Sequence, residues 1–338
     1  MPRLLALLLT AALAAGCTGQ EPSVPPDRAP DQGAAEAAVA LELGAWHDLV
    51  TTPDGLLLVN GYPEDATDAR PLELWRRTDE GWEPVDAPDG PTGRNFVAVA
   101  VDPTTGDVVL HGGLTVDGVS DETWVYDGAW TRVEGPGPGP RASATMAHDE
   151  TSGRTLLYGG DDGSEQHGDT WAFDGATWQR LAEDGPDPVR WPAAMETDPD
   201  GGVVLYGGHQ VVDEDAPLAL GDTWRWDGGG WREVPGASQP GPLVNAAMVV
   251  HPAHGLLLLG GGDVRSRERG RVWRWTGAQW RALPPGLLPG RQAFGAAYDA
   301  DQAVVVLTGG LVEPGSTERH QDTWVWSGDP GDPAQQVG

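Results

Sequence analysis

The sequence predicts an all-β fold built from six similar units, and three observations lead to this prediction. First, a short apolar run followed by a glycine pair recurs at intervals of 47 to 53 residues. Second, in the first five units a Trp-bearing strand follows the pair, and another Trp comes six or seven residues later. Third, no apolar period of 3.6 residues occurs beyond the N-terminal segment, so amphipathic helices are not expected. The second glycines of the pairs are Gly61, Gly113, Gly160, Gly208, Gly261 and Gly310.

Each unit is interpreted as four short strands. The first strand is rich in small residues, and the second is the continuous apolar run before the glycine pair. The third strand alternates, with Trp on one face, and the fourth begins at the later Trp. Turns such as Asp127-Gly128 lie between the third and fourth strands and are typical of hairpins. The first strands are expected at Ala98–Val101, Ala144–Ala147, Ala193–Met195, Ala246–Val249 and Gly295–Ala297.

A radial arrangement explains this gradient of side-chain size. Strands near a central axis are crowded and take small residues, whereas diverging outer strands leave space that Trp fills. A second strand covered on both faces is expected to be apolar throughout. We therefore predict a six-bladed β-propeller with four antiparallel strands per blade, because repetition around a ring protects the strand edges. The length of 338 residues would suggest about two domains, but all-β folds form long single domains.

The repeated motifs resemble those of a known family. Glycine pairs after apolar runs, the Asp-Thr-Trp motifs beginning at Asp169, Asp222 and Asp322, and the later Trp resemble the Kelch repeats of galactose-oxidase-type propellers over residues 43 to about 328. One departure is the short hairpin from Phe173 to Trp178. The resemblance implies a propeller, and the family includes enzymes. A copper-radical oxidase needs a Tyr cross-linked to Cys, and the only cysteine, Cys17, has another assignment, so this activity is not expected.

The sequence shows less directly which segment supplies the fourth strand of the sixth blade and so closes the ring. Unit six ends at Gly328 without its later Trp, and a segment rich in Pro and Gly follows. Because Glu36–Leu43 can be extended, we expect it to supply the outer strand of the sixth blade. The alternative is a disordered N-terminal segment beside an open last blade. These boundaries place the propeller at residues 36–328 and a C-terminal tail at 329–338.

The N-terminal segment predicts where the protein is located. A positive start at Arg3 precedes an apolar run of about twelve residues, which fits a signal peptide and is too short to span a bilayer. The run ends in Leu-Ala-Ala-Gly-Cys, which resembles a bacterial lipobox. We therefore expect residues 1–16 to be a signal peptide, Cys17 to carry a diacylglyceryl group and residues 17–35 to be a flexible tether. The protein would then face the periplasm or exterior of a bacterial cell envelope. The alternative for Cys17 is a buried free thiol.

Composition narrows the possible partners. The formal net charge is −30 and every basic residue is Arg, a field that repels phosphate backbones and makes nucleic acid an unlikely ligand. One cysteine excludes an intrachain disulfide framework. The eight His are scattered, so no metal site and no cofactor are expected. The acidic loops Asp161–Glu165 and Asp213–Asp215 could hold Ca²⁺ but are better interpreted as solvated charge.

One set of basic residues occupies a single repeat position. Guanidinium groups there would encircle one end of the central channel, and their fork suits carboxylate or phosphate. One interpretation is a binding site for an anionic ligand, such as an acidic sugar or a peptide carboxylate. The other is that the residues are part of the repeat and bond backbone carbonyls or a carboxylate. The four residues are Arg94, Arg141, Arg190 and Arg291.

Three functions are compatible with the sequence. The first, which we favour because no catalytic motif is present, is a non-catalytic binding or scaffold lipoprotein for a protein or glycan. The second is a sugar-modifying propeller enzyme of the sialate-mutarotase-like type, which would need a carboxylate and an Arg at the channel mouth. The third is a structural envelope protein without a specific ligand. Fold alone does not choose among them, and a monomer is expected.

Overall fold

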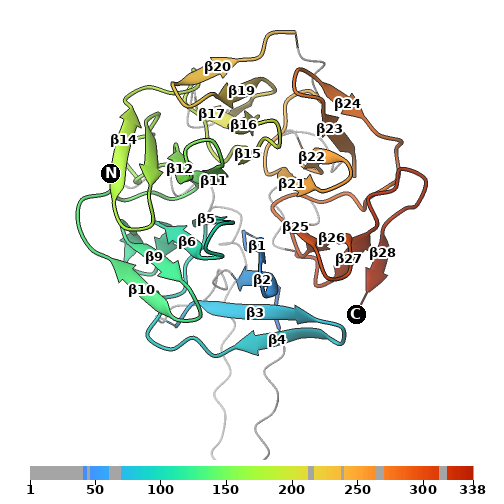
Figure 1. The fold of residues 1–338 in the computed structure, drawn as a ribbon, viewed down its shortest axis with the longest axis horizontal. Helices are drawn as coiled ribbons and strands as arrows, with labels where there is room; N and C mark the ends of the chain where they lie inside the picture. Colours follow the sequence, from blue (N-terminus) through green and yellow to red (C-terminus); the bar gives the residue numbers. More distant parts are fainter. Residues whose placement is uncertain are drawn as a thin grey trace, which may run out of the picture.

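The computed structural model describes residues 41–43, 46–60, 70–211, 217–236, 240–262, 270–311 and 318–337. Within this part of the chain the fold is all-β, with six four-stranded antiparallel sheets arranged as blades around a ring (Figure 1). The predicted six-bladed propeller is thereby confirmed. Each blade comes from consecutive residues, and the chain passes around the ring from β1–β4 to β25–β28.

The inner strand of each blade lines the centre of the ring. Small residues such as Ala98 and Ala297 occupy many inner positions and are buried, because the strands converge at the axis. Neighbouring inner strands pack against one another around the ring, and β1 contacts β25, which closes it. The inner strands are β1 (Asp48–Thr52), β5 (Ala98–Val101), β11 (Thr145–Asp149), β15 (Ala194–Thr197), β21 (Ala247–His251) and β25 (Gly295–Asp299).

The second strands form the buried centre of each blade. Leu58, Leu110 and Leu205 are fully buried, as expected for strands covered on both faces by neighbouring blades. The second strands are β2 (Gly55–Asn60), β6 (Val108–His111), β12 (Arg154–Tyr158), β16 (Val203–Tyr206), β22 (Gly255–Leu259) and β26 (Val304–Thr308).

The glycine pairs after these strands join adjacent blades. Gly112 has a φ of 71° and Gly113 a φ of 92°, a region that favours glycine. A Cβ on Gly112 would lie 2.1 Å from the carbonyl oxygen of Arg141 in the next unit. The N–H of Gly113 donates to that same oxygen at 2.7 Å. The pair is therefore required both by its backbone conformation and by the close approach of the next unit.

The third and fourth strands carry the aromatic residues outward. The third strands are β3 (Glu73–Thr78), β9 (Thr123–Tyr126), β13 (Thr170–Phe173), β19 (Thr223–Trp226), β23 (Val272–Trp275) and β27 (Thr323–Trp326). The fourth strands are β4 (Gly81–Val85), β10 (Trp130–Val133), β14 (Trp178–Ala182), β20 (Trp231–Glu233), β24 (Trp280–Ala282) and β28 (Gln335–Val337). Two small hairpins extend the loops after the second strands of blades two and four. They are β7 (Leu114–Thr115) with β8 (Gly118–Val119), and β17 (His209–Val211) with β18 (Pro217–Ala219).

The expected closure of the sixth blade by Glu36–Leu43 is wrong. The fourth strand there is β28, which pairs antiparallel with β27 through Thr323 and Val337. The propeller therefore extends beyond residue 328, and residues 335–337 are not a tail. Pro and Gly occupy the turn before β28, where Trp326 Nε1 donates to the carbonyl oxygens of Asp329 and Asp332. Residues 36–40 lie outside the described residues, whereas Leu43 exchanges two hydrogen bonds with the Gln321 side chain of blade six.

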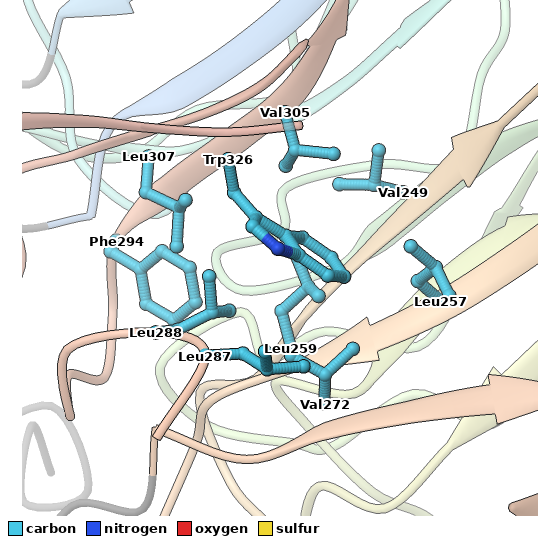
Figure 2. Close-up of a cluster of buried hydrophobic side chains, with 10 residues drawn as sticks. All are labelled: Val249, Leu257, Leu259, Val272, Leu287, Leu288, Phe294, Val305, Leu307 and Trp326. Carbon is cyan, nitrogen blue, oxygen red and sulfur yellow. The ribbon is translucent and has the colours of Figure 1, made fainter. Parts of the chain in front are cut away.

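Indole N–H groups connect neighbouring blades. Trp280 Nε1 of blade five donates to Thr223 Oγ1 of blade four at 3.0 Å, and Trp82 of blade one donates to Thr323 of blade six at 3.2 Å. Blade five carries Val272 instead of this Thr, and the next blade lacks the later Trp. Here Leu287, Leu288 and Trp326 fill the interface with the apolar residues of Figure 2. The missing Trp therefore occurs at an interface where the hydroxyl is also missing. Blade one likewise carries Leu74 at the Thr position, and the indole N–H of Trp130 in blade two has no partner among the described residues.

Candidate functional site

The four arginines at the shared repeat position are buried inside the blades. Arg141 is 2% exposed, and its Nη1 and Nη2 donate to the two carboxylate oxygens of Asp169 at 2.6 and 3.1 Å. Nη1 also donates to the carbonyl oxygen of Gly159 at 3.0 Å. An arginine–carboxylate pair occupies the same position in three other blades. Arg190 donates to both oxygens of Asp222, whereas Arg94 and Arg291 each donate to one carboxylate oxygen, of Glu122 and Asp322.

The carboxylate of each pair also binds the following Trp. Trp171 Nε1 donates to Asp169 Oδ2 at 2.8 Å, and Trp224 donates to Asp222 at 2.7 Å. The Asp-Thr-Trp motif therefore joins the Asp to the indole of its own Trp, a contact that the sequence analysis did not predict. Desolvation alone would raise the pKa of Asp169, but the hydrogen bonds from Arg141 and Trp171 outweigh it and hold the pKa below its ordinary value.

These contacts match the second interpretation of the four arginines, in which they are part of the repeat and bond backbone carbonyls and a carboxylate. Each guanidinium already has a carboxylate and a backbone carbonyl, and none of the four lines the central channel. Only Arg291 has two buried N–H groups, at Nε and Nη2, without a partner among the described residues. Binding of an anion by these residues stays a prediction, and their geometry favours the structural role.

The central channel is the concave site that the inner strands build. It is a cavity of about 710 Å³ whose walls are contributed by β1, β5, β11, β15, β21 and β25. It reaches the turns after the first strands at Pro53, Pro103 and Pro199. Cavities of roughly 300–1,000 Å³ are the size that holds small molecules. The walls are mostly Ala and Val, because only small residues fit where six strands converge.

Two carboxylates interrupt this apolar wall from facing blades. Asp48 begins β1 in blade one, and Glu196 lies in β15 of blade four, and both side chains are partly buried. Burial raises the pKa of each to about 7. The Thr197 N–H donates to Glu196 Oε1 at 2.7 Å and opposes part of this effect. Within the described residues, Asp48 has no hydrogen bond or ion pair that would favour its charged form.

Strand register shows how far the carboxylates depart from the repeat. Asp48 pairs with Val59 and Ala194 pairs with Tyr206, so Asp48 and Ala194 are equivalent. Glu196 is likewise equivalent to Val50. The other four blades carry only small or apolar residues at these two positions: Ala98, Thr145, Ala247 and Gly295 at the first, and Ala100, Ala147, Val249 and Ala297 at the second.

Sequence reasoning did not single out Asp48 or Glu196. The signal was present, because each is a carboxylate in a strand position that is otherwise small or apolar. Identifying it required the register of all six inner strands, and the first unit is the weakest copy of the repeat. Three methionines at one position of blades three to five, Met146, Met195 and Met248, also line the channel and were not recognised as a set.

The remaining candidates have structural contacts or lie outside the described residues. The hydroxyls of Tyr158 and Tyr206 donate to the carbonyl oxygens of Pro186 and Gly241. No group of three or more His, Cys, Asp or Glu in the described part of the chain is placed to hold a metal ion. Cys17 lies outside the described residues. No helix among the described residues has the length and apolarity needed to cross a membrane.

Fold and site define the chain as a six-bladed β-propeller with a central channel that carries carboxylates. Among solved structures it is similar to one described as the structure of YjhT, with a TM-score of 0.65 and 14% sequence identity. The alignment covers 87% of this chain and 97% of that one, and at this identity it shows the fold alone. No protein-family model matches the chain, and no curated protein matches it.

The Arg141–Asp169 pair provides a test of the structural role. Arg141→Ala leaves a buried carboxylate without its partner, which is expected to lower the free energy of unfolding by about 3–5 kcal/mol. Arg180, whose Nε lies 3.6 Å from Asp169 Oδ2 and whose side chain is 45% exposed, is the matched control. Arg180→Ala should cost about 0–1 kcal/mol. Chemical denaturation measures both. A parent-like Arg141→Ala variant that loses binding of an acidic sugar would instead favour the ligand-site interpretation.

The pKa of Asp48 predicts a pH-dependent cost to stability. Its folded pKa of about 7 exceeds the ordinary 3.8, so the folded state binds more protons between these values. Stability therefore falls as pH rises from about 4 to 7. Asp48→Asn removes this cost, so it should raise the melting temperature more at pH 8 than at pH 5, as measured by calorimetry. Asp117→Asn, at the exposed turn between β7 and β8, is the control. An Asp48→Asn effect independent of pH would contradict the prediction.

Proposed function

We propose that this chain is an extracytoplasmic, membrane-anchored lipoprotein with Kelch-type repeats, whose propeller binds a ligand without transforming it. The observation that carries the proposal is the channel of about 710 Å³ formed by all six inner strands. Its volume suits a small molecule or the end of a glycan or peptide. The walls come from a rigid ring of strands, so the site is formed before the ligand arrives.

Anchoring is the part of the proposal that depends on the sequence. The lipobox-like run ending at Cys17 supports lipidation, and residues 18–35 would let the propeller stand away from the membrane. Several acyl chains on one cysteine give stable anchoring, since each buried CH₂ contributes about 0.8 kcal/mol.

A second candidate is a sugar-modifying enzyme of the sialate-mutarotase-like type. The observation that favours it is the presence of two channel carboxylates with pKa values of about 7. Groups that titrate near neutral pH are suited to both donating and accepting a proton. Opening and closing of a sugar ring needs such an acid and a base. The Arg that this class would need at the channel mouth is not among the lining residues that the structure describes.

A ligand screen tests the proposed function and separates the two candidates. The protein is titrated with neutral and acidic mono- and disaccharides and short envelope peptides, and binding is followed by saturation-transfer NMR. We expect at least one ligand to bind the parent and to be weakened in the Thr145→Phe variant, which fills part of the channel. Thr131→Phe on the exposed strand β10 is the matched control. Enhanced exchange between sugar anomers would favour the enzyme. No binding by any compound would contradict both candidates.

Lipidation at Cys17 gives a separate prediction. Cys17→Ser removes the thiol that would carry the diacylglyceryl group, so the protein should shift from the detergent phase to the aqueous phase. Mass spectrometry of the N-terminal peptide should show the acyl groups in the parent only. A parent without acyl mass would overturn the anchor, whatever the outcome of the ligand screen.

A further inference from the structure

Among the described residues, no cation lowers the pKa of Asp48 or Glu196 in the channel lining. The ionisable residue types in the described lining are Asp48, Glu196, Glu150, His148 and Tyr298, and no Arg is among the described lining residues. Lys does not occur anywhere in the chain. Arg94, Arg141, Arg190 and Arg291 are bound to carboxylates inside the blades. Within the described residues, the channel lining therefore offers carboxylates without an Arg or Lys beside them.

We infer that the channel is a site for small organic ammonium cations, whose N–H groups donate to the carboxylates of Asp48 and Glu196. This inference rests on the proposed binding function and names its ligand class. It departs from the sequence-based expectation of an anionic ligand, because the basic residues on which that expectation depended lie outside the channel lining.

The channel offers two carboxylates to a ligand of this class. Blades one and four face each other across the ring (Figure 1), and Asp48 and Glu196 lie in the inner strands of these two blades. Glu196 is two residues further along the inner strand than the position equivalent to Asp48. Two residues of a strand correspond to about 6.6 Å along the strand. A diamine offers one ammonium group to each carboxylate, so it is the probe chosen for this site.

The walls between the carboxylates suit the carbon chain of such a ligand. Met146, Met195 and Met248 occupy one position of three consecutive inner strands; they border the channel but are 6–7% exposed and belong to the buried clusters of the blades. Methionine is flexible and polarisable, so it adapts to irregular apolar ligands. Apart from Met1, these are all the methionines of the chain. The apolar walls also raise the cost of leaving a carboxylate charged and unpaired, and a bound cation would remove that cost.

The residues around each carboxylate come from the two inner strands beside it. β1 packs between β5, which contributes apolar lining from Val97 to Val101, and β25, which contributes Tyr298. The neighbouring His47 bonds Thr308 Oγ1 at 2.7 Å and accepts from Gly295 N. β15, which carries Glu196, packs between β11 and β21. β11 contributes His148 to the lining, and Glu150 lies in the turn after it. The lining residues from β21 and its approach, Ala246–Val250, are apolar.

A cation therefore supplies a counter-charge that these neighbours do not provide. Both carboxyl groups are partly protonated at pH 7 in the free protein, and ammonium binding favours their charged forms. Protons are released on binding, so affinity rises as pH rises from 5 to 8.

Titration calorimetry with 1,4-diaminobutane tests the inference, and 1,4-butanediol is its uncharged counterpart of similar shape. The full chain is used in 150 mM NaCl, which screens the general acidic field. We expect the diamine to bind, the diol not to bind, and the heat at pH 7 to depend on the buffer, because protons are released. Asp48→Asn and Glu196→Gln should each weaken diamine binding about tenfold or more, since a charged hydrogen bond is lost. Asp117→Asn removes the same charge from an exposed turn and should leave the affinity unchanged.

Three results would overturn the inference. The first is that the diamine and the diol bind with the same affinity. The second is that Asp117→Asn weakens diamine binding as much as Asp48→Asn and Glu196→Gln do. The third is that the affinity for the diamine does not change with pH. If sugars or peptides bind in the channel and the diamine does not, the ligand class is wrong and the proposed binding function stands. If none of these compounds binds, both the inference and the proposed function fail. Melting temperatures of the variants show that each is folded, so a lost affinity reports on the site.

Discussion

The structure depends on one buried arginine that serves two blades at once. The backbone carbonyl of Arg141 accepts the N–H of Gly113 from blade two, while its side chain binds Gly159 and Asp169 of blade three. Arg291 repeats this arrangement between blades five and six, through Gly261 and Gly309. At these two junctions the residue fixes the point at which the chain enters the next inner strand. At the junction of blades four and five Leu243 supplies only the backbone carbonyl, which accepts the N–H of Gly208.

Such a buried pair contributes more to specificity of geometry than to net stability. Removing a guanidinium and a carboxylate from water costs several kcal/mol per ion, and close hydrogen bonds offset that cost only when the geometry is good. Asp169 meets this condition, because Arg141 and Trp171 together supply three hydrogen bonds to its two oxygens. The pair accordingly links the inner strand, the glycine pair and the third strand in one orientation.

Asp48 and Glu196 have the opposite character. Within the described part of the chain no cation compensates for their burial, so their ionisation opposes folding instead of supporting it. Residues that cost stability in the free protein are typical of functional sites, where the ligand supplies the missing interaction. Within one chain, the four blade carboxylates have lowered pKa values and the two channel carboxylates have raised ones. The difference comes from the presence or absence of a neighbouring guanidinium.

The amino-acid sequence by itself determined the number of blades and the order of strands within them. Glycine pairs, apolar runs and Trp-bearing strands are local patterns, and their repetition reports the fold directly. It did not determine which residues face the channel, because that depends on strand register and on neighbours from other blades. It also did not determine closure, since Gln335–Val337 has no strand signal of its own and is held by pairing with β27. The roles of the arginines and of Asp48 and Glu196 were decided only in three dimensions, because a charge becomes structural or functional according to which partners the fold brings to it.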